Sequence, residues 1–104
     1  MYPKKVTITG VAVGAWLPVD YKQDIVNIAV AVVVVSGTAT YSVEHTYDNI
    51  FDPTVIPVAF QNAGLTAQTT SKDGNYSVPI RALRLNVTGG TSPVVAMTMI
   101  QSVR

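Results

Sequence analysis

Residues 29–35 are all alanine or valine. Valine loses rotamer freedom in a helix and packs well on a pleated surface, so this run predicts a β-strand. Side chains alternate between the two faces of a strand, and here both alternating sets are apolar. Both faces must therefore be covered, either by a neighbouring molecule or by the same chain, for which the polar segment 61–75 is the candidate.

The preference for β-structure extends along the whole chain. Its 18 valines, 12 threonines and 7 isoleucines make up 37 of the 104 residues, and no window carries a helical apolar stripe. Turn-forming residues separate seven strand candidates, at 5–15, 25–35, 38–47, 55–60, 76–80, 82–88 and 94–102. We therefore predict an all-β chain: a single domain, 1–104, folded as an antiparallel, jelly-roll-like β-sandwich of about seven strands with little or no helix.

The alternation of residue types predicts which side of a strand faces the core. Within 82–88 the apolar set Leu83, Leu85 and Val87 should point inward. The segment 38–47 also alternates, which predicts an ordinary half-buried strand. Residues 72–75, with Asp-Gly at their centre, predict a tight hairpin turn.

Charge is scarce, and this limits the classes of partner. Charged residues make up 12% of the chain, against about 25% in typical soluble domains. The net charge of +1 rests on scattered Lys and Arg residues, which argues against a nucleic-acid partner. The apolar run 25–35 is much shorter than the ~20 residues of a membrane-spanning helix, so we expect no membrane partner either. A surface this poor in charge suits a chain that hides part of it against other chains.

The candidates for chemistry are few. His45 is the single histidine, and although Ser36, Ser42 and Ser71 are available, no nucleophile-elbow glycines surround any of them. We expect His45 to be an ordinary strand-face histidine.

Three carboxylates, Glu44, Asp48 and Asp52, lie close together in the sequence, but their spacing matches no calcium-binding loop. The chain has no cysteine, so it offers no disulfide and no thiolate metal site. We therefore predict no catalytic residue, no metal and no cofactor, and we expect that the protein is not an enzyme.

Three segments, "VEHTYDNIFDP", "DGNYSVPIRALRLNV" and "TGGTSPVVAMTMIQS", carry a resemblance to a known group of proteins. Together they resemble small virion-associated proteins of tailed bacteriophages, over roughly 38–102. The matching positions are Val43, Glu44, Thr46, Asp48, Pro79, Ile80, Arg81, Ala82, Arg84, Leu85, Asn86, Val87, Ile100 and Gln101. The resemblance implies a structural role in the virion, in a protein made in the host cytoplasm.

Two functions remain open at this point. The first is a capsid decoration (cement) protein that binds the major capsid protein or another virion protein as a homo-oligomer and stabilises the shell. The second is a receptor- or carbohydrate-binding module of a tail fibre or spike, with exposed aromatic residues gathered at one rim. The candidate interface residues are Tyr2, Trp16, Val30, Val32, Val34, Phe51 and Phe60. For the four aromatic residues among them, plain core packing is the competing interpretation.

Overall fold

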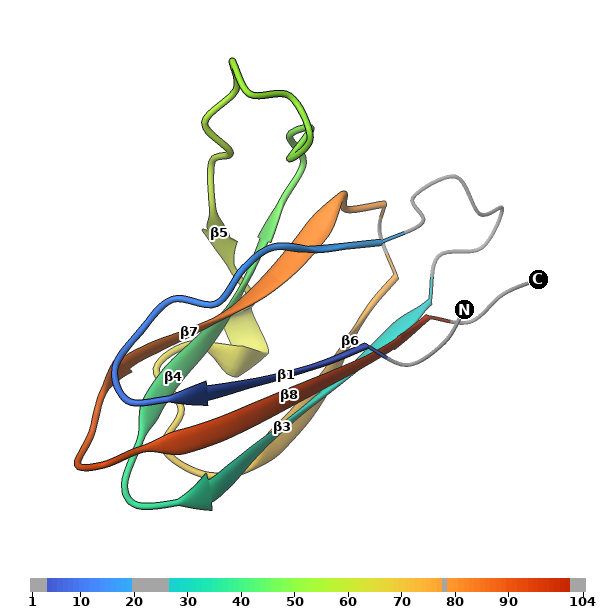
Figure 1. Ribbon diagram of the computed structural model, residues 1–104. Helices are drawn as coiled ribbons and strands as arrows, with labels where there is room; N and C mark the ends of the chain where they lie inside the picture. Colours follow the sequence, from blue (N-terminus) through green and yellow to red (C-terminus); the bar gives the residue numbers. More distant parts are fainter. Residues whose placement is uncertain (1–3, 20–26, 78, 102–104) are drawn as a thin grey trace.

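The computed structural model describes residues 4–19, 27–77 and 79–101, which form two antiparallel sheets of four strands each (Figure 1). The first sheet has the order β1-β8-β3-β6, with β1 at Lys4–Thr9, β8 at Val94–Gln101, β3 at Ile28–Ser36 and β6 at Lys72–Tyr76. The second has the order β2-β7-β4-β5, with β2 at Leu17–Pro18, β7 at Ala82–Gly89, β4 at Thr40–Thr46 and β5 at Phe60–Gln61. A short 3₁₀ helix, η1, spans Ala63–Leu65.

The strand pairs are nested along the chain. β1 pairs with β8, β2 with β7, β3 with β6 and β4 with β5, so the chain runs out and back as one long antiparallel hairpin. This hairpin is rolled so that β8 also pairs with β3 and β7 with β4, which completes the two sheets. The resulting order is that of a jelly roll. The predicted all-β sandwich is confirmed, with eight strands.

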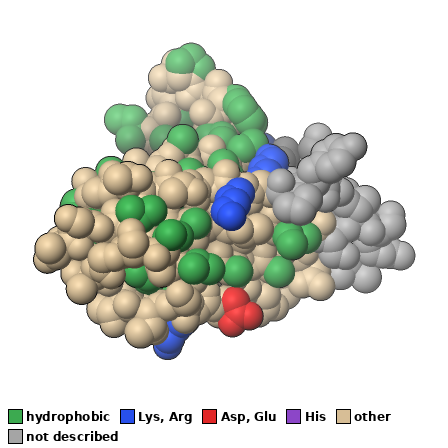
Figure 2. All heavy atoms as spheres, turned by 60° about the horizontal axis from the view of Figure 1, so that its bottom comes forward, with side chains coloured by type: hydrophobic (Ala, Val, Ile, Leu, Met, Phe, Trp, Pro, Cys, Tyr) green, Lys and Arg blue, Asp and Glu red, His purple; other side chains and the backbone are tan. Residues whose placement is uncertain are grey.

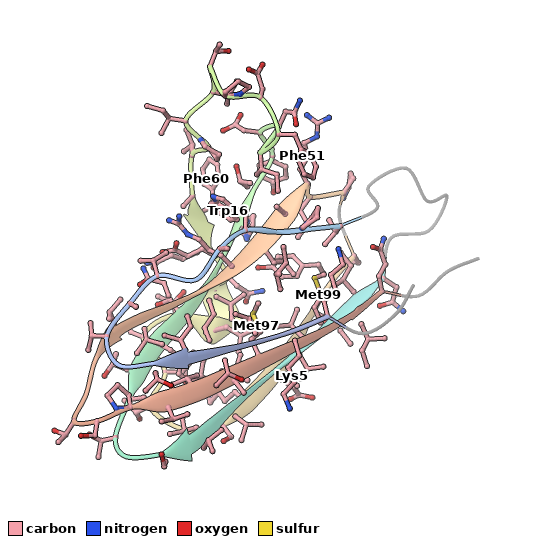
Figure 3. All side chains as sticks on the ribbon, viewed as in Figure 1. Lys5, Trp16, Phe51, Phe60, Met97 and Met99 are labelled. Atoms are coloured by element: carbon pink, nitrogen blue, oxygen red, sulfur yellow. The ribbon has the colours of Figure 1, made fainter. Side chains whose placement is uncertain are left out.

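One hydrophobic core fills the space between the sheets. Figure 3 shows Met97 and Met99 of β8 within this space, and both are fully buried. The largest fully buried side chains are Tyr41, Ile28, Leu65, Ile80, Leu83, Leu85, Met97, Met99, Val30, Val32, Val43 and Val87. The predicted inward set of β7, Leu83, Leu85 and Val87, is confirmed. Burial of such side chains, about 1.5–3 kcal/mol each, is the main force that holds the two sheets together.

Strand β4 is covered on both faces, although its sequence predicts a half-buried strand. Tyr41 and Val43 lie in the core, but Ser42, Glu44 and Thr46 on the other face are also buried. Their polar atoms have partners: Ser42 Oγ accepts a hydrogen bond from the Ala67 amide at 2.9 Å, and Thr46 Oγ1 accepts one from the Asp48 amide at 3.2 Å. The prediction that this face is exposed is therefore wrong. Its polar groups can be buried because side-chain hydrogen bonds satisfy them.

The predicted hairpin turn at 72–75 is wrong. These residues belong to β6, which pairs with β3 and places Gly74 opposite Val30. A Cβ atom on Gly74 would lie 3.2 Å from Leu65 Cδ1, so the glycine is explained by the close approach of Leu65. The strand predicted at 76–80 accordingly ends at Tyr76.

Two further predicted strands are shorter than expected. The strand predicted at 5–15 ends at Thr9, because Gly10 turns the chain with φ of 90°. The strand predicted at 55–60 is reduced to Phe60–Gln61, and the preceding residues form a long loop. Among the described residues, no helix is long and apolar enough to span a membrane.

Candidate functional site

The outer surface of the first sheet carries few charges and several exposed apolar side chains. We call it the open face. Figure 2 shows hydrophobic side chains spread across this side of the molecule, with few charged ones among them. Its central residues, on the outward sides of β3 and β8, are Ala29, Ala31, Val33, Ala96, Thr98 and Ile100. No described segment lies over β3 here: Val33 is 49% and Ile100 48% exposed.

Only one of the two faces of residues 29–35 is covered within the described part of the chain. Ala29, Ala31, Val33 and Val35 are exposed, while the intervening residues point toward the core. The segment 61–75 does not cover them, since its last part forms β6 and pairs with β3 edge to edge. Coverage by the chain's own segment 61–75 is therefore ruled out.

Cross-strand registration arranges this face in rows. One row runs from Lys5 on β1 through Thr98 on β8 and Ala31 on β3 to Asp73 on β6. Figure 3 shows Lys5 projecting outward from β1. The one ion pair within the described part of the chain is Arg84–Glu44 on the other sheet. Lys5 and Asp73 therefore stand on opposite edges of the open face without ionic partners among these residues.

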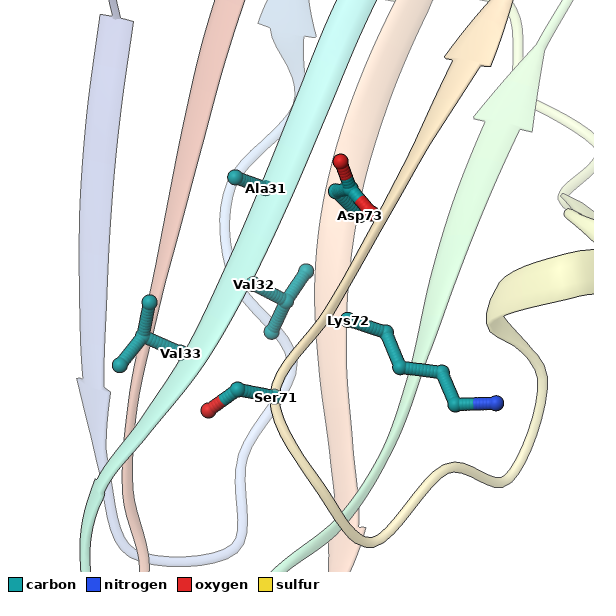
Figure 4. A pocket seen from close by; sticks show the side chains of 6 residues that line it. All are labelled: Ala31, Val32, Val33, Ser71, Lys72 and Asp73. Carbon is teal, nitrogen blue, oxygen red and sulfur yellow. The ribbon is translucent and has the colours of Figure 1, made fainter.

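A shallow hollow of about 270 Å³ lies on the margin of the open face, between β3 and the start of β6 (Figure 4). It forms because β6 starts opposite Val32, whereas β3 continues to Ser36. Ser71 closes part of the gap, since its Oγ accepts a hydrogen bond from the Val34 amide at 3.0 Å. The lining side chains are Ala31, Val32, Val33, Ser71, Lys72 and Asp73.

Residues 47–60, from the end of β4 to the first residue of β5, form a second apolar surface, which we call the arm. Figure 1 shows it projecting beyond the second sheet, away from β1, β8 and β3. Ile56 is 91% and Phe51 75% exposed, and Val58 is exposed as well. Isolated exposed apolar residues are common on proteins, but several gathered on one projecting loop indicate a binding surface.

Side-chain hydrogen bonds to the backbone give the arm a defined shape. Asp48 Oδ2 accepts a bond from the Val58 amide at 2.8 Å, which joins the two ends of the loop. Asn49 Oδ1 accepts one from the Phe51 amide at 3.0 Å, and Asp52 Oδ1 accepts one from the Thr54 amide at 2.9 Å. The bonds from Thr54 also hold the pKa of Asp52 below its usual value. The arm is therefore ordered locally before it meets any partner.

An aromatic cluster lies at the base of the arm. The His45 ring lies near the rings of Tyr47, Phe60 and Tyr76, with centroid distances of 5.6, 6.1 and 5.1 Å respectively. His45 Nδ1 is 2.9 Å from the hydroxyl oxygen of Tyr76. Burial lowers the pKa of His45 and raises the pKa of Tyr76 to about 12, against a hydrogen bond from Asn62 that acts to lower it. Near pH 7 His45 is therefore neutral, and its Nδ1 can accept a hydrogen bond from the Tyr76 hydroxyl.

The outer face of the second sheet carries a polar group of different character. Glu44 is buried there, with Arg84 Nε 2.6 Å from its Oε1 and Asn86 Nδ2 3.1 Å from its Oε2. Burial acts to raise the pKa of Glu44, but the hydrogen bonds from Asn86, Arg84 and Gln61 and the charge of Arg84 outweigh it and lower that pKa. The Arg84 guanidinium lies 4.3 Å from the ring centroid of Trp16. We call these five residues the polar row.

The candidate interface residues fall into three groups. Phe51 and Phe60 lie on the arm, and Trp16 is half-buried in the polar row (Figure 3). Val30 and Val32 lie in the core and Val34 packs against it, so the prediction that these three form a presented surface is wrong; the exposed residues of β3 are those that alternate with them. The wrong set was chosen because both alternating sets of this strand are apolar, so the alternation separates the two sets but does not indicate which one faces inward. Tyr2 lies outside the described residues.

The catalytic and metal candidates are separated from one another. Ser42 bonds to the Ala67 amide and Ser71 to the Val34 amide, whereas the polar partner of His45 is Tyr76. Glu44 is held by the polar row, while the carboxylates of Asp48 and Asp52 bond within the arm. No group of three or more His, Asp or Glu residues that could hold a metal ion occurs in 4–19, 27–77 and 79–101.

Sequence reasoning missed the most exposed side chain of the arm, Ile56. It predicted an irregular stretch at 48–57 on account of Pro53 and Pro57, but it also predicted a strand at 55–60, and neither prediction indicated that Ile56 would be exposed.

Comparisons with known proteins add a distant likeness in fold. No protein-family model matches the chain, and no curated protein matches it. A solved structure of Bacillus endospore appendages, described as disulfide-linked pili, aligns with 99% of this chain and 88% of its own, at a TM-score of 0.44 and 15% identity. At this TM-score the likeness carries no argument about what the chain does.

Proposed function

We propose that the protein is a structural component of a tailed-bacteriophage virion, a capsid decoration protein that stabilises the shell by adhesion. The sequence pattern in 38–102 supports this role, because it resembles that of small virion-associated proteins. The jelly roll is compatible with it, since viral capsid domains use this fold. The observation that carries the proposal is the arm, a preorganised loop that presents Phe51, Ile56 and Val58 to solvent.

The arm would act as an anchor in a groove between capsid subunits. Full burial of an exposed Phe, Ile or Val side chain contributes about 1.5–3 kcal/mol, so three of them provide a substantial part of a binding free energy. The hydrogen bonds from Asp48, Asn49 and Asp52 already fix the loop, which reduces the entropy lost on binding. Each bound copy would link neighbouring subunits and resist expansion of the shell.

Co-sedimentation with shells of the phage that encodes the chain tests this proposal. The wild-type chain should migrate with the shells in a density gradient, and a Phe51→Ser/Ile56→Ser variant should remain near the top. Val11→Ser is the matched control, because Val11 is 58% exposed but lies outside the arm. A wild-type chain that never migrates with shells, or an arm variant that binds as well as Val11→Ser, would contradict the proposal.

The polar row favours a second candidate, a carbohydrate-binding module of a fibre or spike. Trp16 lies beside Arg84, and Arg84, Asn86 and Gln61 surround Glu44, so the polar row combines an aromatic ring with hydrogen-bonding groups; lectins also use the jelly roll. A glycan array separates the two candidates. Binding to a glycan that is lost in Trp16→Ala but kept in Phe51→Ser/Ile56→Ser would favour the carbohydrate function.

A further inference from the structure

We infer that the open face is a contact between two copies of this chain, packed face to face about a two-fold axis that runs parallel to the strands between β3 and β8. The inference rests on the proposed function, for which the sequence predicts a homo-oligomer, and gives that oligomer a geometry. The pairing of charges and of side-chain sizes follows from the strand registration, and the area follows from the number and length of the strands.

The charges select the direction of the axis. A two-fold axis across the strands would lay β1 of one copy over β1 of the other, so Lys5 could not meet Asp73. An axis along the strands lays β1 over β6 instead. Because Lys5, Thr98, Ala31 and Asp73 share one row, Lys5 then faces the partner's Asp73, and Asp73 faces the partner's Lys5. These are the charged residues in the outward sets of the four strands, and both would be paired.

Side-chain sizes fit the same axis. The axis lays β3 of each copy over β8 of the other, row by row. Val33 shares its row with Ala96, so it would face the partner's Ala96, and Ile100 would face the partner's Ala29. In the row between them, Ala31 would face the partner's Thr98. Every row pairs a small residue with a larger one, which allows two sheets to pack at the usual spacing of about 10 Å.

The area is sufficient for a modest dimer. Four strands at ~4.8 Å spacing and about seven residues at ~3.3 Å rise give about 450 Å² per copy, or about 900 Å² in total, just under the ~1,000 Å² of a stable specific interface and in the range of weak ones. We therefore expect a dissociation constant on the order of micromolar. The two exposed ion pairs should make it sensitive to salt.

Sedimentation equilibrium of the purified chain tests the contact without any shell. The wild type should form a dimer that weakens as salt is raised. Ala31→Arg should be monomeric, because it places a long cation at the centre of the face. Val11→Arg, an exposed position outside the face, should dimerise like the wild type. Thermal melting should show both variants folded.

Charge reversal tests the axis itself. Lys5→Asp or Asp73→Lys alone should weaken the dimer roughly tenfold, because each creates two like-charge contacts. The double variant Lys5→Asp/Asp73→Lys should restore dimerisation to near the wild-type level. A purely structural effect of either substitution would not be rescued by the other.

A monomeric wild type at high concentration, a dimer that tolerates Ala31→Arg, or a double variant without rescue would each overturn the inference. A monomeric wild type whose binding to shells is lost in Ala31→Arg would assign the open face to the capsid protein instead. The proposed function fails separately: a chain that dimerises as described but never migrates with shells retains this contact and loses the decoration role.

Discussion

Arg84 lies between Glu44 and Trp16 on the outer face of the second sheet, with its Nε 2.6 Å from Glu44 Oε1 and its guanidinium 4.3 Å from the centroid of the Trp16 ring. The Glu44 side chain is only 7% exposed, so its charge depends on Arg84 and on the amides of Asn86 and Gln61. This arrangement gives the second sheet a buried carboxylate paired with a half-buried guanidinium, where the first sheet has the open face.

Removal of Arg84 should destabilise the protein. Arg84→Ala leaves the Glu44 carboxylate buried without its cation, and should lower the free energy of unfolding by about 2–3 kcal/mol. Lys5→Ala removes an exposed cation and, at protein concentrations too low for the dimer to form, should change it by less than about 0.5 kcal/mol. Urea unfolding at pH 7 measures both; equal effects of the two substitutions would contradict this role of Arg84.

The lowered pKa of Glu44 predicts a pH dependence. A carboxyl group with a lower pKa in the folded state binds fewer protons there than in the unfolded state, so its stabilisation is present above the unfolded pKa of 4.5. It is lost as the pH falls from that value through the folded pKa. The stability difference between wild type and Glu44→Gln should therefore shrink in urea titrations between pH 6 and pH 3. A difference that stays constant over this range would show that Glu44 does not act through its charge.

Substitutions in the arm should separate binding from folding. Ile56 and Phe51 make little contact with the core, so Ile56→Ser and Phe51→Ser should each change the free energy of unfolding by less than about 0.5 kcal/mol. Leu65→Ser, a fully buried position just beyond β5, should cost at least about 3 kcal/mol. Thermal melting checks these values, and arm variants as unstable as Leu65→Ser would mean that the arm packs against the core.

The sequence predicted the class of fold and the inward set of β7, because alternation in 82–88 has one apolar and one polar phase. It could not orient β3, where both phases are apolar and only the tertiary packing decides that Val30 faces inward. The prediction for β4 was wrong for a different reason. Its polar side chains are buried because they bind groups from distant segments, as Ser42 binds the Ala67 amide and Glu44 binds Arg84. Local patterns do not contain such contacts.

Turn prediction from glycine-containing segments was wrong at one place and correct at another. Asp73-Gly74 has the composition of a hairpin turn, but Gly74 serves a close contact with Leu65. Gly90 lies among the turn-forming residues that separate the predicted strands 82–88 and 94–102, and it does adopt a positive φ of 126°. The arm was predicted to be irregular around Pro53 and Pro57, but its exposure and projection depend on the whole fold.

These two glycines should respond differently to alanine. Gly90→Ala combines an unfavourable φ with a collision between its Cβ and the carbonyl oxygen of Thr38, so it should cost at least about 3 kcal/mol. Gly74→Ala meets only the end of the Leu65 side chain, which can shift, and should cost about 1 kcal/mol. Gly64→Ala, with its nearest contact at 3.5 Å, is the control. Urea unfolding ranks the three, and a Gly90→Ala variant as stable as Gly64→Ala would contradict this geometry.

The histidine at the base of the arm should make stability fall in mild acid. Burial lowers the pKa of His45 below its ordinary value of 6.5, so the unfolded state binds more protons than the folded state between these two values. The free energy of unfolding should therefore decrease as the pH falls from 6.5 through the folded pKa, and be fully retained above 6.5. Thermal melting from pH 7.5 to pH 5 should show this decrease in the wild type.

His45→Gln tests the origin of this pH dependence. Glutamine does not titrate and can still hydrogen-bond to the Tyr76 hydroxyl, so the variant should show a nearly flat melting temperature from pH 7.5 to pH 5. Tyr76→Phe removes the hydroxyl and should cost about 1 kcal/mol at pH 7, while it retains the titration of His45. Glu44 does not account for the effect, because its pKa is lowered from 4.5 and it titrates below this range. If His45→Gln kept the wild-type slope, the decrease would have to come from another group.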